Sequence, residues 1–512
     1  MEPYEPYHNE KHVITASLTK DLTENIRLFE NIFYHCDDIV KRQFTIGKNY
    51  KTDIYLAYTD NMIDRKVLQQ DTIRNIIYRM DDLPAFNQFD FIKNRALQSA
   101  DVKELLTMDE ITQSTITGDV VILVDGYDKA LMLSLKSFPN RGIAAVETEV
   151  TVRGAKDSFT EVAAFNKVLI RRRIKDTNLK MQNLKVGIRS RTDVTLCYIE
   201  GIAKPSIIAE VKKRLAGFTI DGILDVGMLE NLIETKWYSL FPQFQTTERP
   251  DKTSSALLEG RIVLLVDNSP MALILPVTLN SFFQAADDYY SRWPFVSFIR
   301  VLRYFAAFFA MGFPGLYVVV TNYQPELLPT SLALSFATAR QGVPFSIMVE
   351  VVILLLAFEL LMEAGIRLPS PMGNTIGIVG GLIMGDAAVS ANLVSPMVVI
   401  VVAFTAIASF TIPNETFLSA FRLVKYLILL LSSILGLYGF ILSIMLVLVH
   451  LADLKSFGIP YLSPFVAANL EKDHPMSDSL LKFPIFKMIY RPIYAIRGNK
   501  KRLSGYRGKY DK

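Results

Sequence analysis

The run YFAAFFAMGFPGLYVVVTNYQP, at residues 304–325, contains no charged side chain and indicates what kind of protein this is. It exceeds the ~20 apolar residues that a helix needs to cross the ~30 Å hydrocarbon core of a bilayer. Three more uncharged runs follow, at 368–385, 387–414 and 426–452. In a soluble all-helical core, several such helices would lack the polar face that surface helices carry. The C-terminal half is therefore predicted to be an α-helical membrane domain.

A fifth candidate span, at 345–362, is apolar apart from two glutamates. Together the runs predict about five membrane helices between residues 296 and 452. The short apolar stretch at 327–339 stays open as a sixth.

The C-terminal tail sets the expected orientation. Residues 491–512 contain eight Lys or Arg and one acid, so the positive-inside rule predicts a cytoplasmic tail. The first forty residues are polar and charged, so we expect no cleavable signal and a cytoplasmic N-terminal region. Both ends on one side require an even number of crossings, which leaves about four to six.

The first half of the chain contains an internal duplication. TDIYLAY at 52–58 resembles TDVTLCY at 192–198, and GDVVILVD at 118–125 resembles GRIVLLVD at 260–267. The pieces occur in the same order with nearly the same separation. Each unit reads as a buried strand, a helix and a hairpin whose turn contains Gly, Asn, Asp or Pro. The sequence therefore predicts two similar small α/β subdomains, an α+β soluble half in front of the multi-pass membrane domain.

The expected helices after the first strands are 67–80 and 207–215, and the expected hairpin turns are 126–128 and 268–270. The predicted domains follow in chain order: an N-terminal helical or flexible segment 1–50, a first subdomain 51–136, a connecting segment 137–190, a second subdomain 191–290, the membrane domain 291–455 and a basic tail 456–512.

Composition excludes several classes of protein. The 512 residues are 50% hydrophobic and 21% charged, and 55 basic residues against 51 acidic ones are too balanced to favour nucleic acid. Cys36 and Cys197 cannot build a disulfide framework, and the five histidines show no metal spacing. No GxxxxGK[ST] string and no nucleophile pattern is present. We expect no enzyme, no cofactor and no metal.

The connecting segment contains clustered arginines: Arg153, Arg171, Arg172 and Arg173. One interpretation is an ordinary solvated helix face. The alternative is an anchor that binds carboxylates of another subdomain or subunit.

Three glycines in the candidate span at 368–385, Gly377, Gly381 and Gly385, repeat every four residues. On a helix they form a stripe that lets a neighbouring helix approach closely. Helix packing is the favoured interpretation, and an oligomer seam or sliding surface is the alternative. Asp386 and Asn392 follow the stripe and are candidates for a pore or a gate.

Three glutamates on the fifth candidate helix, Glu350, Glu359 and Glu363, are the other pore or gating candidates, because carboxylates in membrane helices are costly and face protein or water. At about 100° per residue, Glu350 lies on the opposite side from Glu359. Glu359 is favoured for a pore or a water-filled seam, with a satisfied helix–helix contact as the alternative. Glu363 is expected to pair with Arg367, four residues on.

The whole series of strings resembles the GerA family, the A subunits of bacterial spore germinant receptors. The resemblance runs from about residue 31 to 465, and its strings include HCDD, VRGAKDSFTE, LIRRRI, DVTLCYIEGIA, FPQFQTTERPD, GRIVLLVDNSP, DDYYSRW, LPTSLALSFATARQGVPF, ELLMEAGIRLPSPMGNTIGIVGG, DAAVSANLVSP, ASFTIP and SFGIPYLSPF.

The resemblance implies a protein of the spore inner membrane that acts with a transporter-like B subunit and a lipoprotein C subunit. It implies an oligomeric, nutrient-gated cation channel that triggers germination, in contact with membrane lipid and not with nucleic acid. Three alternatives stay open: a paralogue that amplifies ion release, a solute transporter, and a non-conducting scaffold. A transporter fits prolines near residues 369, 371 and 396, but its repeats would lie in the membrane half.

Overall fold

The computed structural model describes residues 14, 16–48, 50–79, 87–96, 101–138, 149, 151, 153–367, 381, 385–466 and 478–503. The chain forms two compact units. The α/β unit comprises Met1–Glu234, Thr246–Pro276 and Arg491–Arg502, and the helical unit comprises Thr235–Gln245, Val277–Tyr490 and Leu503–Lys512.

The first sheet of the α/β unit has five antiparallel strands in the order β1-β2-β4-β5-β3. Its strands are β1 (Ile39–Ile46), β2 (Thr52–Thr59), β3 (Val102–Leu105), β4 (Val120–Val124) and β5 (Ala130–Leu133). Its helical segments are α1 (Leu22–Ile32), α2 (Arg65–Val67), the π-helical turn Leu68–Ile73, α3 (Arg74–Arg79), α4 (Gln88–Phe91), the π-helical turn Ile92–Ala96 and α5 (Met108–Ile116).

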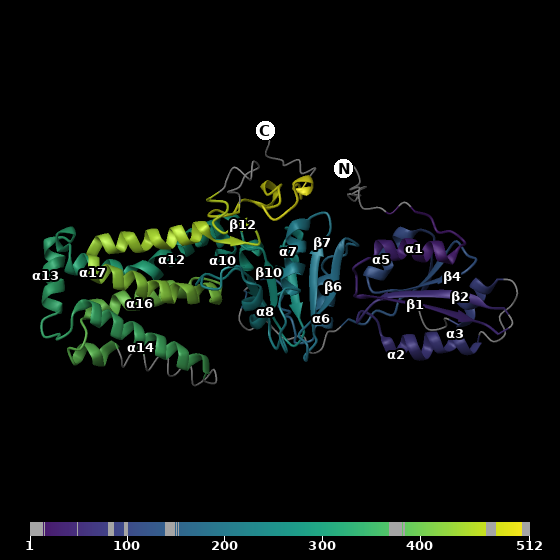
Figure 1. Cartoon of the computed structure of the whole chain (residues 1–512), viewed down its shortest axis with the longest axis horizontal. Helices are drawn as coiled ribbons and strands as arrows, with labels where there is room; N and C mark the ends of the chain where they lie inside the picture. Colours follow the sequence, from purple (N-terminus) through teal and green to yellow (C-terminus); the bar gives the residue numbers. More distant parts are fainter. Residues whose placement is uncertain are drawn as a thin grey trace. The chain divides into compact units, whose positions relative to one another are not determined.

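Strand β2 is buried on both faces, as its continuous apolar run predicts. Ile54 and Leu56 pack in the cluster that contains residues of α3 and α4, whereas Tyr55 and Ala57 pack in the cluster that contains α1 and α5. This alternation follows the two-residue period of a strand. Figure 1 shows the sheet between these two helical layers.

The second sheet repeats the first, in the order β6-β7-β9-β10-β8. Its strands are β6 (Leu179–Val186), β7 (Thr192–Ile199), β8 (Gln245–Thr247), β9 (Ile262–Val266) and β10 (Ala272–Leu275). Its helices are α6 (Ala163–Arg171), α7 (Pro205–Leu215), α8 (Val226–Ile233) and α9 (Pro250–Leu258). The shared strand order confirms the predicted duplication, including both hairpins and both strand–helix pairs.

The sheets extend beyond the boundaries that the sequence suggests. Strand β1 lies within the segment 1–50, and β6 lies within the connecting segment 137–190. Both are edge strands with the sequences IVKRQFTI and LKMQNLKV. Charged side chains are typical of sheet edges, so these strands lack the apolar run that identifies β2 and β7.

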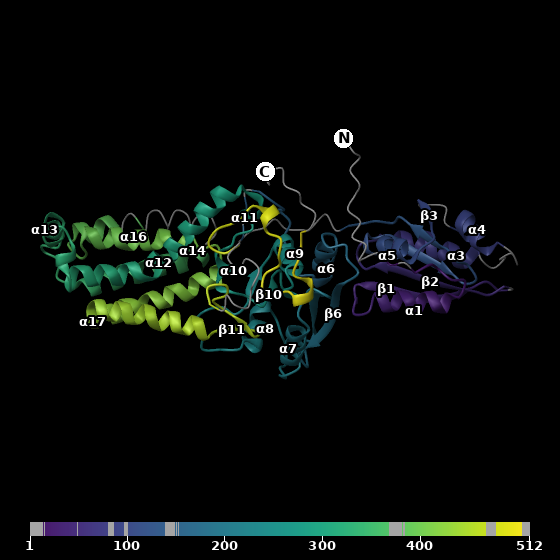
Figure 2. The same cartoon turned by 90° about the horizontal axis from the view of Figure 1, so that it is seen from above.

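Among the described residues, the longer helices of the helical unit number five. They are α12 (Trp293–Asn322), α13 (Thr330–Ala339), α14 (Ile347–Arg367), α16 (Pro396–Phe410) and α17 (Glu415–Asp453), preceded by the short α10 (Leu279–Phe283) and α11 (Asp287–Tyr290). Figure 2 shows α12, α16 and α17 running alongside one another. The small hairpin of β11 (Lys455–Ser456) and β12 (Ile459–Pro460) follows α17.

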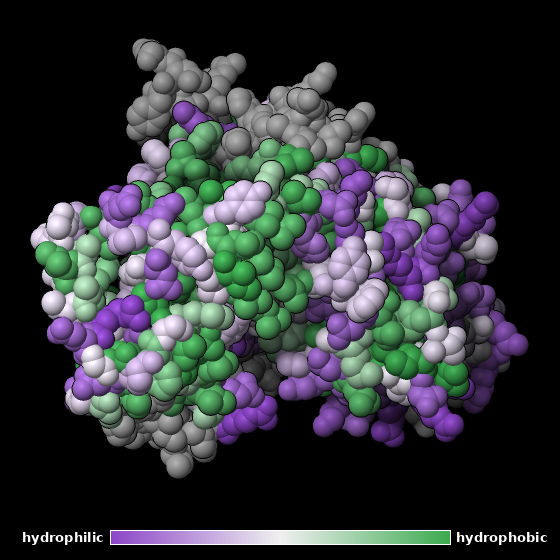
Figure 3. Space-filling view, turned by 60° about the vertical axis from the view of Figure 1, so that its left-hand side comes forward, coloured by the Kyte–Doolittle hydropathy of each residue, from purple (hydrophilic) through white to green (hydrophobic). Residues whose placement is uncertain are grey.

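Two described helices, α12 and α17, are long and apolar enough to cross a membrane, whereas α13 and α16 are apolar but shorter. The sequence predicts about five spans. Helix α14 differs because it contains three glutamates and an arginine, and most of the expected span 368–385 lies outside the described residues. Hydrophobic residues cover broad areas of the face in Figure 3.

Helix α17 is not one straight helix, because Gly436 interrupts it with φ 61° and ψ −139°. The ring of Phe241 lies 6.0 Å from that of Phe417 and 6.1 Å from that of His450. A straight helix would separate Phe417 and His450 by about 50 Å. The chain therefore reverses at Gly436, and the single crossing predicted for 426–452 is wrong.

The reversal depends on glycine. A Cβ at Gly439 would lie 2.0 Å from the carbonyl oxygen of Leu431, and one at Gly436 would meet the Tyr323 ring at 3.0 Å. The hydroxyl of Tyr323 donates to the carbonyl of Ser433 next to the turn. We call residues 415–435 the outgoing arm and 437–453 the return arm. Both pack against α12 around the cluster of Phe417, Phe421, Ile428 and Phe440.

Candidate functional site

Glu350 is fully buried at the start of α14. One carboxylate oxygen accepts a hydrogen bond from Arg340 at 3.2 Å, and the other accepts one from the backbone N–H of Ser395 at 2.8 Å. Ser395 is the N-cap of α16, whose first amides have no partner within the helix. Glu350 therefore joins the turn after α13 to the N-terminus of α16.

The surroundings of Glu350 contain further buried polar atoms. They are Nε of Arg340, which has no acceptor in the described part of the chain, and the hydroxyls of Tyr317 and Ser395, which interact with each other. Buried polar groups in proteins are generally hydrogen-bonded to protein or water. This end of the bundle is therefore polar enough to hold water molecules.

Glu359 lies further along α14 and contacts the outgoing arm of α17. Its carboxylate accepts from Lys425 at 3.1 Å and lies 3.7 Å from Arg422. The Glu359 side chain is 22% exposed, whereas Lys425 is 5% exposed. The partly exposed carboxylate of Glu359 thus faces two cations. Glu359, Arg422 and Lys425 together carry one more positive than negative charge.

Glu363 pairs with Arg367 on its own helix at 2.6 Å, and both side chains are exposed. This pair is the one expected from the four-residue spacing. The three glutamates of α14 contact three different parts of the protein, and which of them faces a pore stays a prediction.

The remaining candidates of the helical unit form no described hydrogen bond or ion pair with these carboxylates. Asp386 and Asn392 are exposed, and Asn392 occupies the left-handed region in the turn before α16. A Cβ at Gly381 would meet nothing within 4 Å, and one at Gly385 would lie 3.7 Å from Val399. Gly377 lies outside the described residues. Among the described residues, no neighbouring helix lies within 4 Å of the position of a Cβ at Gly381.

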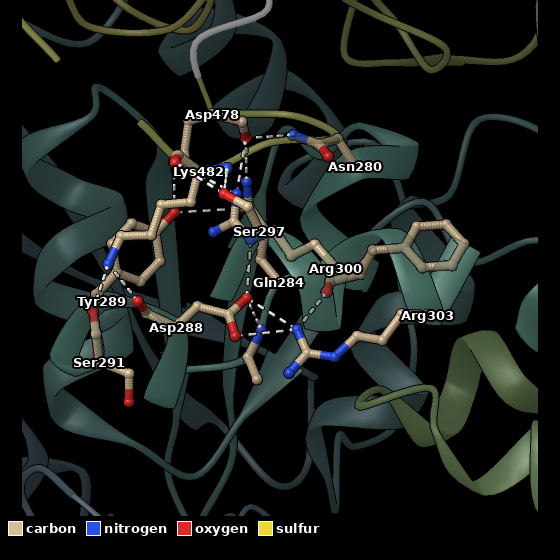
Figure 4. A network of polar contacts seen from close by, with 12 residues as sticks. Asn280, Gln284, Asp288, Tyr289, Ser291, Ser297, Arg300, Arg303, Asp478 and Lys482 are labelled. Atoms are coloured by element: carbon tan, nitrogen blue, oxygen red, sulfur yellow. Dashed lines mark hydrogen bonds and ion pairs between the residues drawn. The ribbon is translucent and has the colours of Figure 1, made fainter. Parts of the chain in front are cut away.

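A polar network at the base of α12 was not foreseen from the sequence. Arg300 donates to buried Asp288 at 3.0 Å and to Asp478 at 2.7 Å, and Arg303 donates to Asp288 at 2.8 Å. Lys482 donates to the backbone carbonyl of Asp288. Figure 4 shows Asp288 between the two arginines, with Asp478 on the far side of Arg300. The network fastens the segment after residue 477 to α11 and α12.

A second ion pair connects the two sheets within the α/β unit. Both oxygens of Asp38 accept from Arg171, at 2.8 and 2.9 Å, and both side chains are buried. The backbone N–H of Asp37 donates to Met181, whose own N–H donates to His35. The HCDD string at residues 35–38 is thus hydrogen-bonded to the edge strand β6 of the second sheet, and the chain then continues into β1 of the first sheet.

The other arginines of the connecting segment have different surroundings. Arg173 pairs with Asp157 at 2.7 Å, Arg172 lies over the ring of Phe138 at 5.1 Å, and Arg153 is exposed. Arg171 thus forms the described ion pair that joins the connecting segment to the first sheet. Burial raises the pKa of the nearby Cys197 thiol to about 12, so this cysteine stays protonated and is a poor nucleophile.

Sequence reasoning missed Arg340, Arg422 and Lys425 as partners of the α14 glutamates. Charges that border long apolar runs are the signal that could have found them, because Arg422 and Lys425 fall just before the run at 426–452. Which glutamate each cation meets depends on the packing of α14 against its neighbours, which spacing along one helix does not specify.

Comparison with known proteins shows the family. The model of the Bacillus/Clostridium GerA spore germination protein family matches residues 27–494. The chain belongs to the GerA family. It is 37% identical to the uncharacterized membrane protein YfkQ of Bacillus subtilis, over 94% of this chain and 93% of that protein. It is 39% identical to spore germination protein A1 of Bacillus subtilis, over 88% of this chain and 91% of that protein.

Among solved structures, the chain is similar to the N-terminal domain of the A subunit of the Bacillus megaterium spore germinant receptor GerK3. That match has 30% identity and a TM-score of 0.41, and it covers 51% of this chain and 96% of that domain.

Proposed function

We propose that this GerA-family chain is the membrane subunit of a spore germinant receptor, and that several copies form a nutrient-gated cation channel. The observation that carries the proposal is Glu359, which is held on the apolar helix α14 by Lys425 and Arg422 of α17. Rings of acidic side chains select cations in channels. While α14 and α17 stay together, the Glu359 carboxylate is paired with Lys425 and Arg422. When the two helices separate, the carboxylate becomes free to interact with a permeating cation.

The proposal includes partners and a location. The receptor contains a transporter-like B subunit and a lipoprotein C subunit, and it resides in the spore inner membrane. The relatives' printed names, spore germination protein and membrane protein, support this placement.

The fold of the C-terminal tail supports placing the N-terminal region and the tail on the same side of the membrane. Residues Arg491–Arg502 belong to the α/β unit, where the N–H of Ile496 donates to Ile202 at 2.9 Å. A tail that is part of the α/β unit lies on the same side of the membrane as that unit. This arrangement requires an even number of crossings, and the reversal at Gly436 supplies two of them.

A second candidate is a non-conducting subunit that couples the α/β unit to its partners. The observation that favours it is that Glu350, Glu359 and Glu363 are each paired with a cation of the same chain. In that case the pairs hold the bundle together and never face a permeating ion.

The test is ion current across a planar bilayer that contains the purified complex of this chain with its B and C partners, with and without candidate nutrients. A channel gives a nutrient-dependent cation current. Glu359→Gln is expected to change its cation-over-anion permeability by about fivefold, which corresponds to the ~1 kcal/mol that one charge contributes at 4 Å in water.

Glu363→Gln is the matched control, because it removes the same charge from the same helix at an exposed pair. Its current is expected to stay within twofold of the unmodified complex. A silent but fully assembled complex contradicts the channel and favours the coupling subunit, and equal effects of the two substitutions contradict the role of Glu359.

A further inference from the structure

A cavity of about 380 Å³ lies between α12 and both arms of α17. Its lining is almost entirely hydrophobic and includes Phe283, Ala307, Met311, Phe421, Ile444 and Leu451. Engineered apolar cavities of ~150 Å³ stay dry and bind apolar molecules. A larger one with so little polar lining has no means of holding water, so its occupant is a hydrocarbon.

The rim of the cavity adjoins the polar network of Figure 4. Phe283 lines the cavity with its ring, and its backbone carbonyl accepts from Arg303 at 2.9 Å. Tyr304 also lines the cavity, while its hydroxyl donates to Asn280 at 2.8 Å. Short segments of α10 and α12 thus contribute residues both to the apolar lining and to the charged network.

The network carries more positive than negative charge. Two arginines, Arg300 and Arg303, pair with two carboxylates, Asp288 and Asp478, and Lys482 adds a third cation that donates to the backbone carbonyl of Asp288. The Arg303 side chain is 12% exposed, so a ligand at the rim of the cavity can reach it. Arginine recognises phosphate and carboxylate oxygens.

Hydrocarbon beside an anion is the chemistry of an acidic lipid. Basic pockets between membrane helices bind the head groups of such lipids. We propose that the cavity binds an anionic phospholipid, with an acyl chain between α12 and the two arms of α17 and the phosphate at the partly exposed Arg303 on the rim. The inference rests on the membrane placement of the helical unit and is independent of whether the protein conducts ions.

The test uses the full-length chain in nanodiscs of mixed phosphatidylglycerol and phosphatidylcholine. The probe is a phosphatidylglycerol with a photoactivatable diazirine in its acyl chain, and crosslinked peptides are mapped by mass spectrometry. Crosslinks are expected on α12 around Ala307 and on the return arm around Ile444. Ala307→Leu fills the cavity and is expected to lower this labelling about tenfold.

Ala337→Leu is the matched control, because it adds the same atoms to an exposed position of α13 and leaves the labelling unchanged. Met311→Phe fills the cavity by a different side chain and is expected to give the same loss as Ala307→Leu. Thermal unfolding of each variant checks that it is folded. Equal cavity labelling in the folded Ala307→Leu, Met311→Phe and control variants overturns the site.

The head group is tested by competition. Unlabelled phosphatidylglycerol is expected to displace the probe about tenfold more effectively than phosphatidylcholine. Arg303→Gln removes this preference, Arg303→Lys retains most of it, and Arg367→Gln, at an exposed arginine, leaves it intact. Equal displacement by the two lipids in the unmodified chain overturns the anionic part of the proposal.

The outward-facing residues separate failure of the site from failure of the membrane placement. Ile434 and Tyr438 are exposed near the α17 turn and are expected to be labelled in every variant. Labelling there without labelling of the cavity overturns the lipid site alone. No labelling anywhere contradicts the membrane placement.

Discussion

Two ion pairs of this protein, one in each unit, differ in how completely they are satisfied. In the α/β unit, Asp38 and Arg171 form two parallel hydrogen bonds with almost no exposure. In the helical unit, Glu359 is partly open and shares its charge between Lys425 and Arg422. A bidentate, dry pair fixes one geometry, whereas a shared carboxylate has several arrangements of similar energy. The first pair therefore suits a rigid joint, and the second suits a contact that changes.

A third carboxylate completes the comparison because it has no described cationic partner. Glu230 on α8 is partly buried, and desolvation together with repulsion by Glu234 raises its pKa to about 7. The three acids thus represent a closed pair, an open pair and an unpaired group. Three substitutions test whether these descriptions hold.

The largest effect is expected for Asp38→Ala. It leaves the Arg171 guanidinium buried without its counter-charge, which costs about 3–5 kcal/mol in comparable pairs. The measurement is the free energy of unfolding of the full-length chain by urea, followed through hydrogen exchange of the amides of β1 and β6. Asp157→Ala, which breaks the more exposed pair with Arg173, is the control and is expected to cost about 1 kcal/mol or less. Equal losses for the two variants would show that the joint is not rigid.

A smaller effect is expected for Lys425→Met. It removes one of two cations, and Arg422 remains close to Glu359. The loss of one charged hydrogen bond corresponds to about 1.5–3 kcal/mol, so hydrogen exchange of the α14 amides near Glu359 is expected to increase by at least about tenfold. Complete loss of protection in α14 would contradict this description, because it would show that the Glu359 contact depends on a single partner, as the Asp38–Arg171 pair does. Glu363→Gln is the control and is expected to leave the hydrogen exchange of α14 unchanged.

The smallest effect is the pH dependence contributed by Glu230. Because its pKa is raised in the folded chain, the folded state binds the proton more tightly than the unfolded state. Its contribution is fully present below the unfolded value of 4.5 and is lost as the pH rises through about 7. Glu230→Gln is expected to flatten the fall of unfolding free energy between these values. The full pKa difference corresponds to ~3 kcal/mol, and water at the partly exposed carboxylate reduces this to about 1–2 kcal/mol. An unchanged slope would mean that water reaches the carboxylate and that the group is not desolvated.

The sequence predicted the features that repeat or run continuously. The strings at 52–58 and 192–198 predicted the central strands of both sheets, and the paired hairpins followed from their turn residues. Such features are local, because a buried strand shows its hydrophobic run and a tight turn shows its special residues. The Glu363–Arg367 pair belongs to the same group, since both partners lie on one helix.

Only the tertiary structure determined the features that depend on a second segment. The apolar run at 426–452 gave no sign of reversal, which required Gly436 and Gly439 to meet Tyr323 and Leu431. The edge strands β1 and β6 were missed because their charged side chains hide the apolar run by which a strand is recognised. Only the pairing with β2 and β7 shows that these segments are strands at a sheet edge.

The partners of the candidate residues belong to this second group. Glu359 meets Lys425, and Arg171 meets Asp38 from far along the chain. A sequence lists which charges need a partner, because leaving them buried and alone is costly. The packing of separate elements selects the partner, because many charges along the chain are chemically equivalent and only proximity in space distinguishes them.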